Sequence, residues 1–384
     1  MRRSVCVAAL LVAVHWPMAL AAQTPPHPEG GPATWEYGGF ADVADLIDAA
    51  DPDNVSFRSR GTTWHLNATH LNMAGAYVRR VRPAKSGFGA ELLVHAGKDS
   101  ELFGFSATAP PLRGAGALRH VGLANVSYRS PAGAGLTVVG GIFPSLIGYD
   151  SLYAKDNAAY TRSWAADFTP YLMMGGSAAY AVTPALEITA FVINGYWHLA
   201  HANGVPSGGA QFAYRPTPRL TIKQTVLSGP HQSSIAFRFW RHLTDTVVEY
   251  RTTQLTAAFN IDFAKERIAE DARTTATWIA GQAVLNWRPV QRWSFTIRPE
   301  AAKDSHARWT LARQTVRALT TGTQYQVMRG GLGAAIRAEH RVDVSTGPDE
   351  GFFRDSTPST ALKRTQHLLV AALILTFAGG PTRP

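Results

Sequence analysis

The chain has 384 residues, of which 46% are hydrophobic and 17% charged, with one Cys and a formal net charge of +10. So many apolar residues and so few charges exclude an intrinsically disordered chain, and a single Cys excludes a disulfide scaffold or a thiolate zinc site. The positive charge is scattered, with no run of five like charges, so we set nucleic acid aside as a partner.

Residues 1–21 have the pattern of a secretory signal peptide. Two arginines precede an apolar stretch, and Ala19-Leu20-Ala21 has the small residues after which signal peptidase cuts. Cleavage there would leave 35 basic and 27 acidic residues, a net charge of +8. The alternative is an uncleaved anchor over residues 5–22, which His, Trp and Pro interrupt. We therefore expect an exported protein whose mature chain begins at Ala22.

Strands dominate the mature chain. The longest apolar run, residues 368–378, is too short for a membrane-spanning helix. In residues 185–194, by contrast, alternate positions are apolar on one face and mixed on the other, which is the period of a β-strand. The same alternation recurs over residues 136–142, 220–224, 255–263, 283–287, 293–297 and 332–338.

The connections between these strands alternate strictly in length. Tight turns rich in Pro, Gly or Thr fall near residues 81–86, 129–134, 183–185, 215–219, 251–254, 288–292 and 328–331. Long irregular stretches fall near residues 47–62, 97–118, 145–170, 197–207, 229–241, 265–274, 301–314 and 343–364. A soluble sandwich has no reason for this alternation, whereas an outer-membrane barrel has short periplasmic turns and long outer loops.

Seven turns and eight loops make fifteen connections, and hence sixteen strands. We predict an all-β fold: a transmembrane antiparallel β-barrel of about 16 strands (14–18), with short periplasmic turns and long extracellular loops. Closure is required because an open sheet edge in hydrocarbon leaves backbone groups unpaired. The expected domains are a signal peptide at 1–21, an N-terminal periplasmic segment at 22–34, the barrel at 35–378 and a C-terminal tail at 379–384.

Aromatic residues lie near the proposed tight turns, on the apolar face of their strands, as in the interfacial girdle of a membrane barrel. They are Tyr128, Tyr180, Tyr214, Tyr250, Trp287, Trp293 and Tyr325. A barrel of sixteen strands is too wide for side chains alone to fill, so we expect an aqueous channel.

One block of sequence carries a family resemblance. Its residues are Gly141, Phe143, Pro144, Ile147, Gly148, Tyr149, Asp150, Asn157, Tyr160, Arg162, Ser163 and Trp164. This pattern resembles the outer-membrane porins grouped as the putative β-barrel porin-2, or OmpL-like, family, in which Glu is expected where Asp150 stands. Weaker echoes at residues 39–42, 192–197, 214–217 and 336–343 extend the resemblance over nearly the whole mature chain. The resemblance implies a passive or weakly selective porin in the bacterial outer membrane.

The same block forms a loop of about two dozen residues that is long enough to fold into the lumen. We predict that residues 144–164 contribute to a constriction, with Asp150, Lys155 and Arg162 as its charged candidates. An equally open reading is that Tyr160, Trp164 and Arg162 only pack the loop against the wall, because Arg stacked on aromatic rings is common in structural roles.

Strand parity places seven basic and seven acidic residues on the inward face, so the sequence predicts no dominant sign for ion selectivity. The basic residues are Arg129, Arg215, Lys223, Arg288, Arg298, Arg337 and Arg341. The acidic residues are Glu91, Glu187, Asp245, Glu249, Asp262, Glu300 and Glu339. Our candidates for lining the pore are Glu187, Lys223, Asp262, Arg298, Arg337, Glu339 and Arg341. Glu339 lies between two arginines on one face, which suggests an ion pair that stiffens the wall.

Catalytic motifs are missing from the sequence. It has no Gly-x-Ser-x-Gly elbow, His-Glu-x-x-His helix, phosphate-binding loop or dinucleotide fingerprint. The nearest pair of histidines, His198 and His201, lies in an expected loop without an acidic neighbour, so we expect no metal, no cofactor and no enzymatic activity. The alternatives to a porin are an outer-membrane β-barrel hydrolase and a plugged structural or adhesive barrel. The expected partners are outer-membrane lipid and small hydrophilic solutes or ions, and a homo-oligomer such as a trimer is left open.

Overall fold

The structure is a computed structural model. It describes residues 34–379, apart from residues 53–54, 84–85, 103–114, 132, 134, 197–204, 231–239, 268–273 and 355–361. Several predicted features lie outside the described residues. They are the signal peptide, the N-terminal segment before Thr34, the tail after Gly379, and the histidines at 198 and 201.

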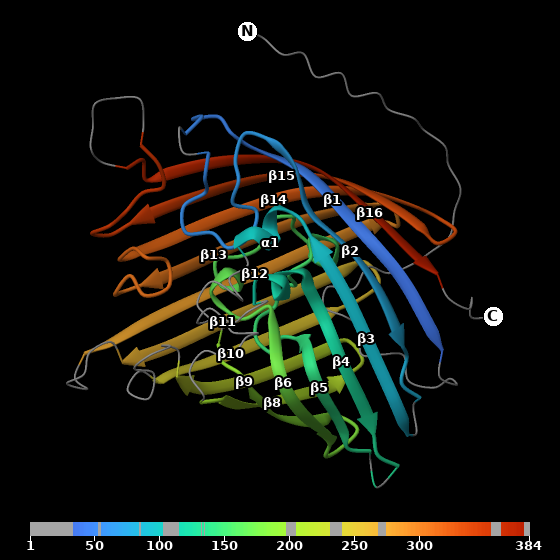
Figure 1. Cartoon of the computed structure of the whole chain (residues 1–384). Helices are drawn as coiled ribbons and strands as arrows, with labels where there is room; N and C mark the ends of the chain where they lie inside the picture. The colour runs from blue at the N-terminus through green and yellow to red at the C-terminus, as the bar shows by residue number, and fades with distance from the viewer. Residues whose placement is uncertain are drawn as a thin grey trace.

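Sixteen antiparallel strands form one closed barrel, as Figure 1 shows. They are β1 (Trp35–Asp48), β2 (Thr69–Arg80), β3 (Gly87–Ala96), β4 (Val121–Arg129), β5 (Thr137–Pro144), β6 (Leu172–Ala181), β7 (Leu186–Ile193), β8 (Ser207–Thr217), β9 (Leu220–Pro230), β10 (Trp240–Arg251), β11 (Leu255–Arg267), β12 (Thr275–Val290), β13 (Trp293–Asp304), β14 (Gln314–Arg329), β15 (Leu332–Thr346) and β16 (Thr365–Gly379). Each strand pairs with its neighbours along the chain, and β1 pairs with β16 to close the ring. The predicted antiparallel β-barrel and the count of sixteen strands are confirmed.

Helical structure is scarce. The described residues contain α1 (Lys98–Leu102) and three short 3₁₀ turns, η1 (Ala115–His120), η2 (Ala154–Asp156) and η3 (Ala166–Phe168). None of the helices in this part of the chain is long and apolar enough to cross a membrane.

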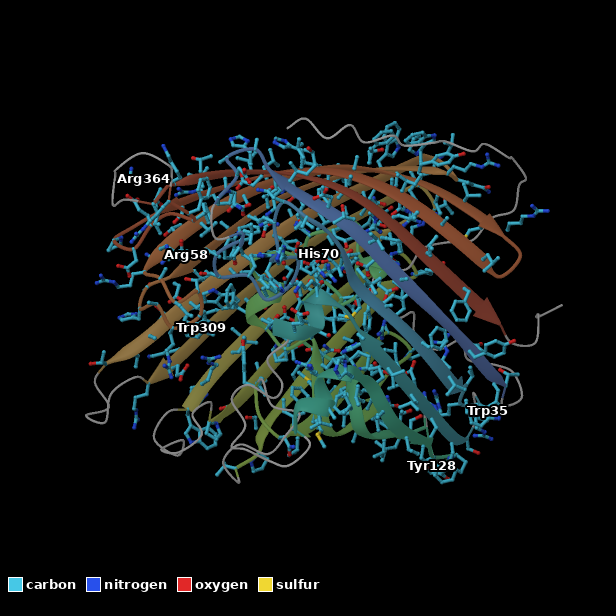
Figure 2. All side chains as sticks on the ribbon, turned by 45° about the horizontal axis from the view of Figure 1, so that its top comes forward. Trp35, Arg58, His70, Tyr128, Trp309 and Arg364 are labelled. Carbon is cyan, nitrogen blue, oxygen red and sulfur yellow. The ribbon has the colours of Figure 1, made fainter. Side chains whose placement is uncertain are left out.

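Short and long connections alternate around the barrel, as the sequence predicts. Connections such as 218–219, 291–292 and 330–331 have two residues, whereas residues 145–171 make the longest connection. Consecutive connections lie at opposite ends of an antiparallel barrel. Figure 2 accordingly places Trp35 and Tyr128 at the turn end, and Arg58 and Arg364 at the loop end.

The barrel has its apolar face outside and its polar face inside. On β13, Ile297 is 42% exposed while the next residue, Arg298, is 1% exposed. Trp287 and Trp293 near the turns are also exposed on the outer face. An apolar exterior with charged residues inside is the arrangement of a barrel surrounded by lipid.

The two sides of the barrel differ in height. Strands β4 to β7 have eight to ten residues, whereas β11 to β16 have twelve to sixteen. Figure 1 shows this as short green strands opposite long yellow to red ones. Inside the barrel, loop and strand residues form a buried aromatic cluster made up of Phe57, Trp164, Phe168, Trp278, Trp309 and Phe352.

Candidate functional site

The connection of residues 145–171 between β5 and β6 lies inside the barrel, and we call it the inserted loop. Its two ends are joined by a hydrogen bond from the Ser145 N–H to the Tyr171 carbonyl oxygen, at 3.0 Å. Just before the loop, Gly141 has φ +121°, and a Cβ there would lie 2.2 Å from the Ala124 carbonyl oxygen. Only glycine fits this position, which explains why the motif before the loop contains it.

Two polar side chains give the inserted loop its own internal structure. Asn157 accepts from the Ser151 N–H at 2.7 Å and donates to the carbonyl oxygens of Ser151 and Tyr153, at 2.8 and 3.3 Å. Asp150 accepts from the Ser163 N–H at 2.8 Å. The bonds of Asn157 close a turn within the first half of the loop, and the bond of Asp150 ties that half to the second, so the loop is an internally bonded unit.

Arg162 lies at the centre of this unit, with no exposed surface. Its Nη1 donates to the Tyr160 carbonyl oxygen at 3.0 Å, and its Nε and Nη2 donate to the carbonyl oxygen of Leu152. Asp99 of α1 lies 3.4 Å from Nη2. Burial lowers the pKa of Arg162, but Asp99 and nearby groups outweigh it, so the pKa is raised overall. Its guanidinium therefore binds carbonyl groups of the loop itself.

The inserted loop is bound to β15 on the inner wall. Glu339 accepts hydrogen bonds from the N–H groups of Tyr160 and Thr161, at 2.6 and 3.3 Å, and from the Thr161 hydroxyl. Two residues away, Arg337 donates to the carbonyl oxygens of Ala154 and Asn157, at 2.8 and 2.7 Å. The sequence suggested an ion pair within the wall for Glu339, whereas its carboxylate binds the loop backbone.

A second attachment joins the loop to β13. The N–H of Trp164 donates to Glu300 at 2.6 Å, and Arg298 donates to the Thr161 carbonyl oxygen at 2.6 Å. Glu300 also pairs with Arg341 at 2.9 Å. Because each buried charge here has an opposite charge or a backbone partner, the cluster avoids the large cost of an unpaired buried ion.

The first part of the loop reaches the opposite wall, on β8, β9 and β10. Bonds on this side join the Leu146 carbonyl oxygen to Gln211 and Thr225, the Gly148 N–H to Asp245, and the Tyr149 hydroxyl to Glu249. On β1, Asp42 accepts from the Tyr160 hydroxyl at 2.6 Å. The inserted loop therefore crosses the lumen from one wall to another.

Arg60, in the connection between β1 and β2, binds the inserted loop from the loop end of the barrel. The Arg60 guanidinium lies 2.8 Å from Asp167, donates to the Arg162 carbonyl oxygen at 2.6 Å, and stands over the Trp164 ring at 5.0 Å. Burial lowers the pKa of Arg60, and Asp167 opposes that effect. This contact holds Trp164 between the wall and the loop above it.

Asp99 is a buried acid at the edge of the same network. It accepts from the Thr63 N–H at 2.7 Å. Burial raises the pKa of Asp99 to about 7, although Arg162 lowers it. The carboxyl therefore changes its charge near neutral pH, beside the central arginine of the inserted loop.

The structure divides the predicted site residues into two groups. Seven of them meet in the buried contacts between loop and wall: Tyr160, Arg162, Trp164, Arg298, Arg337, Glu339 and Arg341. Three others keep part of their surface exposed on the loop or the facing wall: Asp150, Lys155 and Lys223. Glu187 pairs loosely with Arg215 at 3.8 Å, and the two side chains are 39% and 40% exposed. Asp262 is fully buried on β11.

Sequence reasoning missed several members of the network. Arg60, Asp99 and Asp167 lie in connections, where strand parity gives no information. Asp42 lies in the short motif at residues 39–42, and that motif was the one signal that could have identified it. Parity placed Glu300 inside the barrel but could not show that the loop covers it.

Comparisons with known proteins agree with this geometry. Among solved structures, the chain is similar to an anion-selective porin from Comamonas acidovorans (TM-score 0.59, 10% identity, covering 90% of this chain and 100% of that one). It is also similar to the outer membrane channel DcaP of Acinetobacter baumannii (TM-score 0.56, 10% identity, 90% and 97%) and to a trimer form of OmpT, an outer membrane protein of Vibrio cholerae (TM-score 0.54, 8% identity, 91% and 100%). At these identities the similarity shows a shared fold.

Comparison with curated protein sequences finds no significant match. The sequence pattern of one family, described as "Putative beta-barrel porin-2, OmpL-like", matches residues 35–377, which is most of the chain. The resemblance seen in the sequence is therefore confirmed, and the chain belongs to the OmpL-like β-barrel porin-2 family of the bacterial outer membrane.

Proposed function

We propose that ions and small hydrophilic solutes diffuse passively through this porin, past the inserted loop. One observation carries the proposal: at the turn-end mouth of the closed barrel, the charged pair Glu187 and Arg215 keeps about two fifths of its side-chain surface exposed. Lys155 and Asp156 on the inserted loop keep about a quarter. A barrel of sixteen strands is too wide for its inward side chains to fill, so exposed charged groups on its inner side support a water-filled path.

The passage we propose runs beside the first half of the inserted loop. Residues 159–171 are all buried, whereas several residues of 144–158 are partly exposed. The path would therefore follow Asp150, Lys155 and Asp156, and not the buried Arg162. Arg162 would act by holding the loop in shape.

The exposed charge along this path is close to balanced, so we propose weak ion selectivity. Of the fourteen inward charges, seven are buried beneath the loop: Arg298, Arg337, Arg341, Asp245, Asp262, Glu300 and Glu339. The others, which are partly or largely exposed, are Arg129, Arg215, Lys223, Arg288, Glu91, Glu187 and Glu249. Four basic against three acidic residues leave no ring of one sign, which strong selectivity requires.

Planar-bilayer recording tests this function. The purified protein should give discrete ohmic current steps, with a reversal potential near zero in a tenfold KCl gradient. Lys155→Glu should shift the reversal potential toward that of a cation-selective pore, while Lys303→Glu, on the outer face, should not. A reversal potential close to the Nernst value for either ion would contradict weak selectivity.

The contacts of the inserted loop with opposite walls favour a second candidate, a barrel that this loop closes. The same recording separates the two, because a closed barrel gives no current steps. We assign no catalytic step to the protein. A hydrolase of the same architecture would release product from lipid or peptide substrates, and we expect none.

We propose that the long loops face the cell exterior and the short turns the periplasm. The alternation of connection lengths supports this orientation. Leu311, in a long loop, is 81% exposed, and Gln291, in a short turn, is also exposed. If the leader with Cys6 is removed, each site can carry the only thiol. A membrane-impermeant maleimide should label Leu311→Cys and not Gln291→Cys on intact cells, and the reverse labelling would invert the topology.

We also propose that the short side of the barrel lies against other copies of this chain. A strand of eight residues is about 26 Å long and, at a tilt of about 40°, spans about 20 Å. The apolar band of such barrels is about 25 Å high. Strands β5 and β7, with eight residues each, are therefore too short to face lipid alone.

Polar residues on the outer face of β9 and β10, which follow β7 and β8 around the barrel, support this self-association. Gln224 on β9 donates to the Thr244 hydroxyl at 2.7 Å and accepts from the Thr246 hydroxyl at 2.6 Å. They share the outward face with Val226 and Trp240. Polar groups at this depth are poorly accommodated in hydrocarbon.

Light scattering in mild detergent tests the assembly. The wild-type chain should form an oligomer such as a trimer, and a variant with Gln224→Leu, Thr244→Val and Thr246→Val should shift toward the monomer. Thr321→Val, another outward threonine on β14, is the matched control. A monomeric wild type would refute the proposal.

A further inference from the structure

Four side chains that carry oxygen lie next to one another on the inner faces of β10, β11 and β12. Asp245 and Asp262 stand directly opposite each other across β10 and β11, and Asn260 and Gln282 do so across β11 and β12. Asn260 donates from Nδ2 to Asp245 at 2.7 Å. All four side chains are 2% exposed or less. The register therefore gathers them into one buried polar group.

Several polar atoms in this group have no hydrogen-bond partner. Asn260 Oδ1 and both polar atoms of Gln282 have none among the described residues, and Asp262 meets only the side chains of Asp245 and Asn260. Asp245 is bound by Asn260 and by the Gly148 N–H at 3.1 Å. A buried acceptor left unpaired costs about 1–3 kcal/mol, and more when it is charged. This group is therefore incomplete as a purely structural network.

We propose that these four residues bind a hard cation of the calcium class between the wall and the inserted loop. The available donors are all oxygen, from two carboxylates and two amides, and hard cations prefer such ligands. No group of three or more His, Cys, Asp or Glu that could hold a metal ion occurs among the described residues, so a site here needs the two neutral amides to complete its ligands. Two carboxylates facing each other in a buried site also require a positive charge for both to stay ionised.

Two further charges act on the site from its surroundings. Lys223 on β9 interacts electrostatically with Asp245, and Asp150 of the inserted loop interacts with Asp262. Their charges are opposite, so together they leave the excess negative charge of the carboxylate pair in place. A divalent ion would balance that excess.

The position of the site links the ion to the inserted loop. Gly148 of the loop binds Asp245 directly, and Leu146 binds Thr225 on the neighbouring strand. An ion held by Asp245 and Asp262 would fix the wall that these two loop residues contact. The effect on conduction rests on the proposed channel function, while the binding site itself does not.

Isothermal titration tests the site on the full chain, refolded in detergent without lipopolysaccharide and stripped with EDTA. Calcium chloride should bind at one ion per chain at pH 7.5. Asp262→Asn should weaken binding at least tenfold, and so should Gln282→Met, which keeps both carboxylates and nearly the same volume. Asp349→Asn, a change to an acid outside the site in the connection between β15 and β16, should leave binding unchanged.

Two outcomes would overturn the inference. A wild-type chain that takes up no calcium would show that the two carboxyl groups share a proton instead. Equal binding by the wild type and by both site variants would place the ion elsewhere. Titration measures binding without current, so calcium uptake by a protein that shows no current steps would refute the channel function and not the site.

Discussion

Replacing Glu339 by Gln should release part of the inserted loop from the barrel wall. The carboxylate accepts bonds from two loop N–H groups and one hydroxyl, and it has 5% exposure. Gln has nearly the same shape but keeps only one acceptor oxygen, and its NH₂ group would face a loop N–H. The substitution therefore removes charge-assisted bonds without leaving a cavity.

The size of the effect follows from the contacts. Hydrogen bonds to a charged group contribute about 1.5–3 kcal/mol each, so losing one or two costs about 3 kcal/mol. Since 1.4 kcal/mol corresponds to a factor of ten, the ratio of released to bound loop should rise about a hundredfold. The neighbouring Arg341 keeps Glu300 and Asp343 as partners, so the wall itself should stay folded.

Two assays report the release. In bilayers, E339Q should show larger and more variable single-channel conductance than the wild type. In detergent, trypsin should cleave the loop of the folded variant at Arg162, which is fully buried in the wild type. E187Q is the matched control, because it removes the same charge from the lumen at a half-exposed residue. Wild-type conductance and trypsin resistance in E339Q would refute the attachment of the loop through Glu339.

Three further substitutions probe the loop and its surroundings. Gly141→Ala places a Cβ 2.2 Å from a backbone oxygen at φ +121° and should abolish the heat-modifiable folded band on gels, whereas Gly140→Ala, with open space, should not. Burial raises the pKa of Asp99 to about 7, so between about pH 4 and 7 the folded state holds a proton that the unfolded state has lost. Thermal stability should therefore fall as the pH rises through this range, and Asp99→Asn should remove the dependence. Trp164→Phe loses the 2.7 Å bond to Asp343 and should lower thermal stability by about 1–3 kcal/mol, and an unchanged melting temperature would contradict it.

The strands could be predicted from the sequence because their signals are local. Alternation with a period of two gives each strand and its faces, and turn residues give its ends. The predicted turn at 328–331 thus corresponds to the observed connection 330–331. Arg298, Arg337 and Glu339 were placed on the inner face by the same rule, and their burial agrees with it.

The contacts of the inserted loop could not be predicted in this way. Thr161 and Glu339 are 178 residues apart in the sequence, and Trp164 and Glu300 are 136 apart. Parity places a wall residue inside the barrel but does not say whether water or a loop covers it. The sequence therefore predicts Arg162 among the charges of a constriction, whereas the structure buries it within the loop.

The polar interior explains why the loop is attached through charges. A barrel in lipid has its apolar residues outside, so hydrophobic burial alone cannot fix a loop against its inner wall. Apolar contacts such as Phe57 with Trp164 join one loop to another, and a smaller number, such as Phe168 with Trp278 of β12, reach the wall. At the wall, the loop is held mainly by carboxylates and guanidinium groups that bind its backbone, as Glu339 and Arg337 do. Because backbone groups are the same in any residue, these wall charges fix the course of the loop while leaving the side chains of its exposed half free to vary. On the path we propose, the residues that line the passage and those that hold the loop are therefore different, so a lining residue can change ion preference without moving the loop, whereas releasing the loop should change conductance.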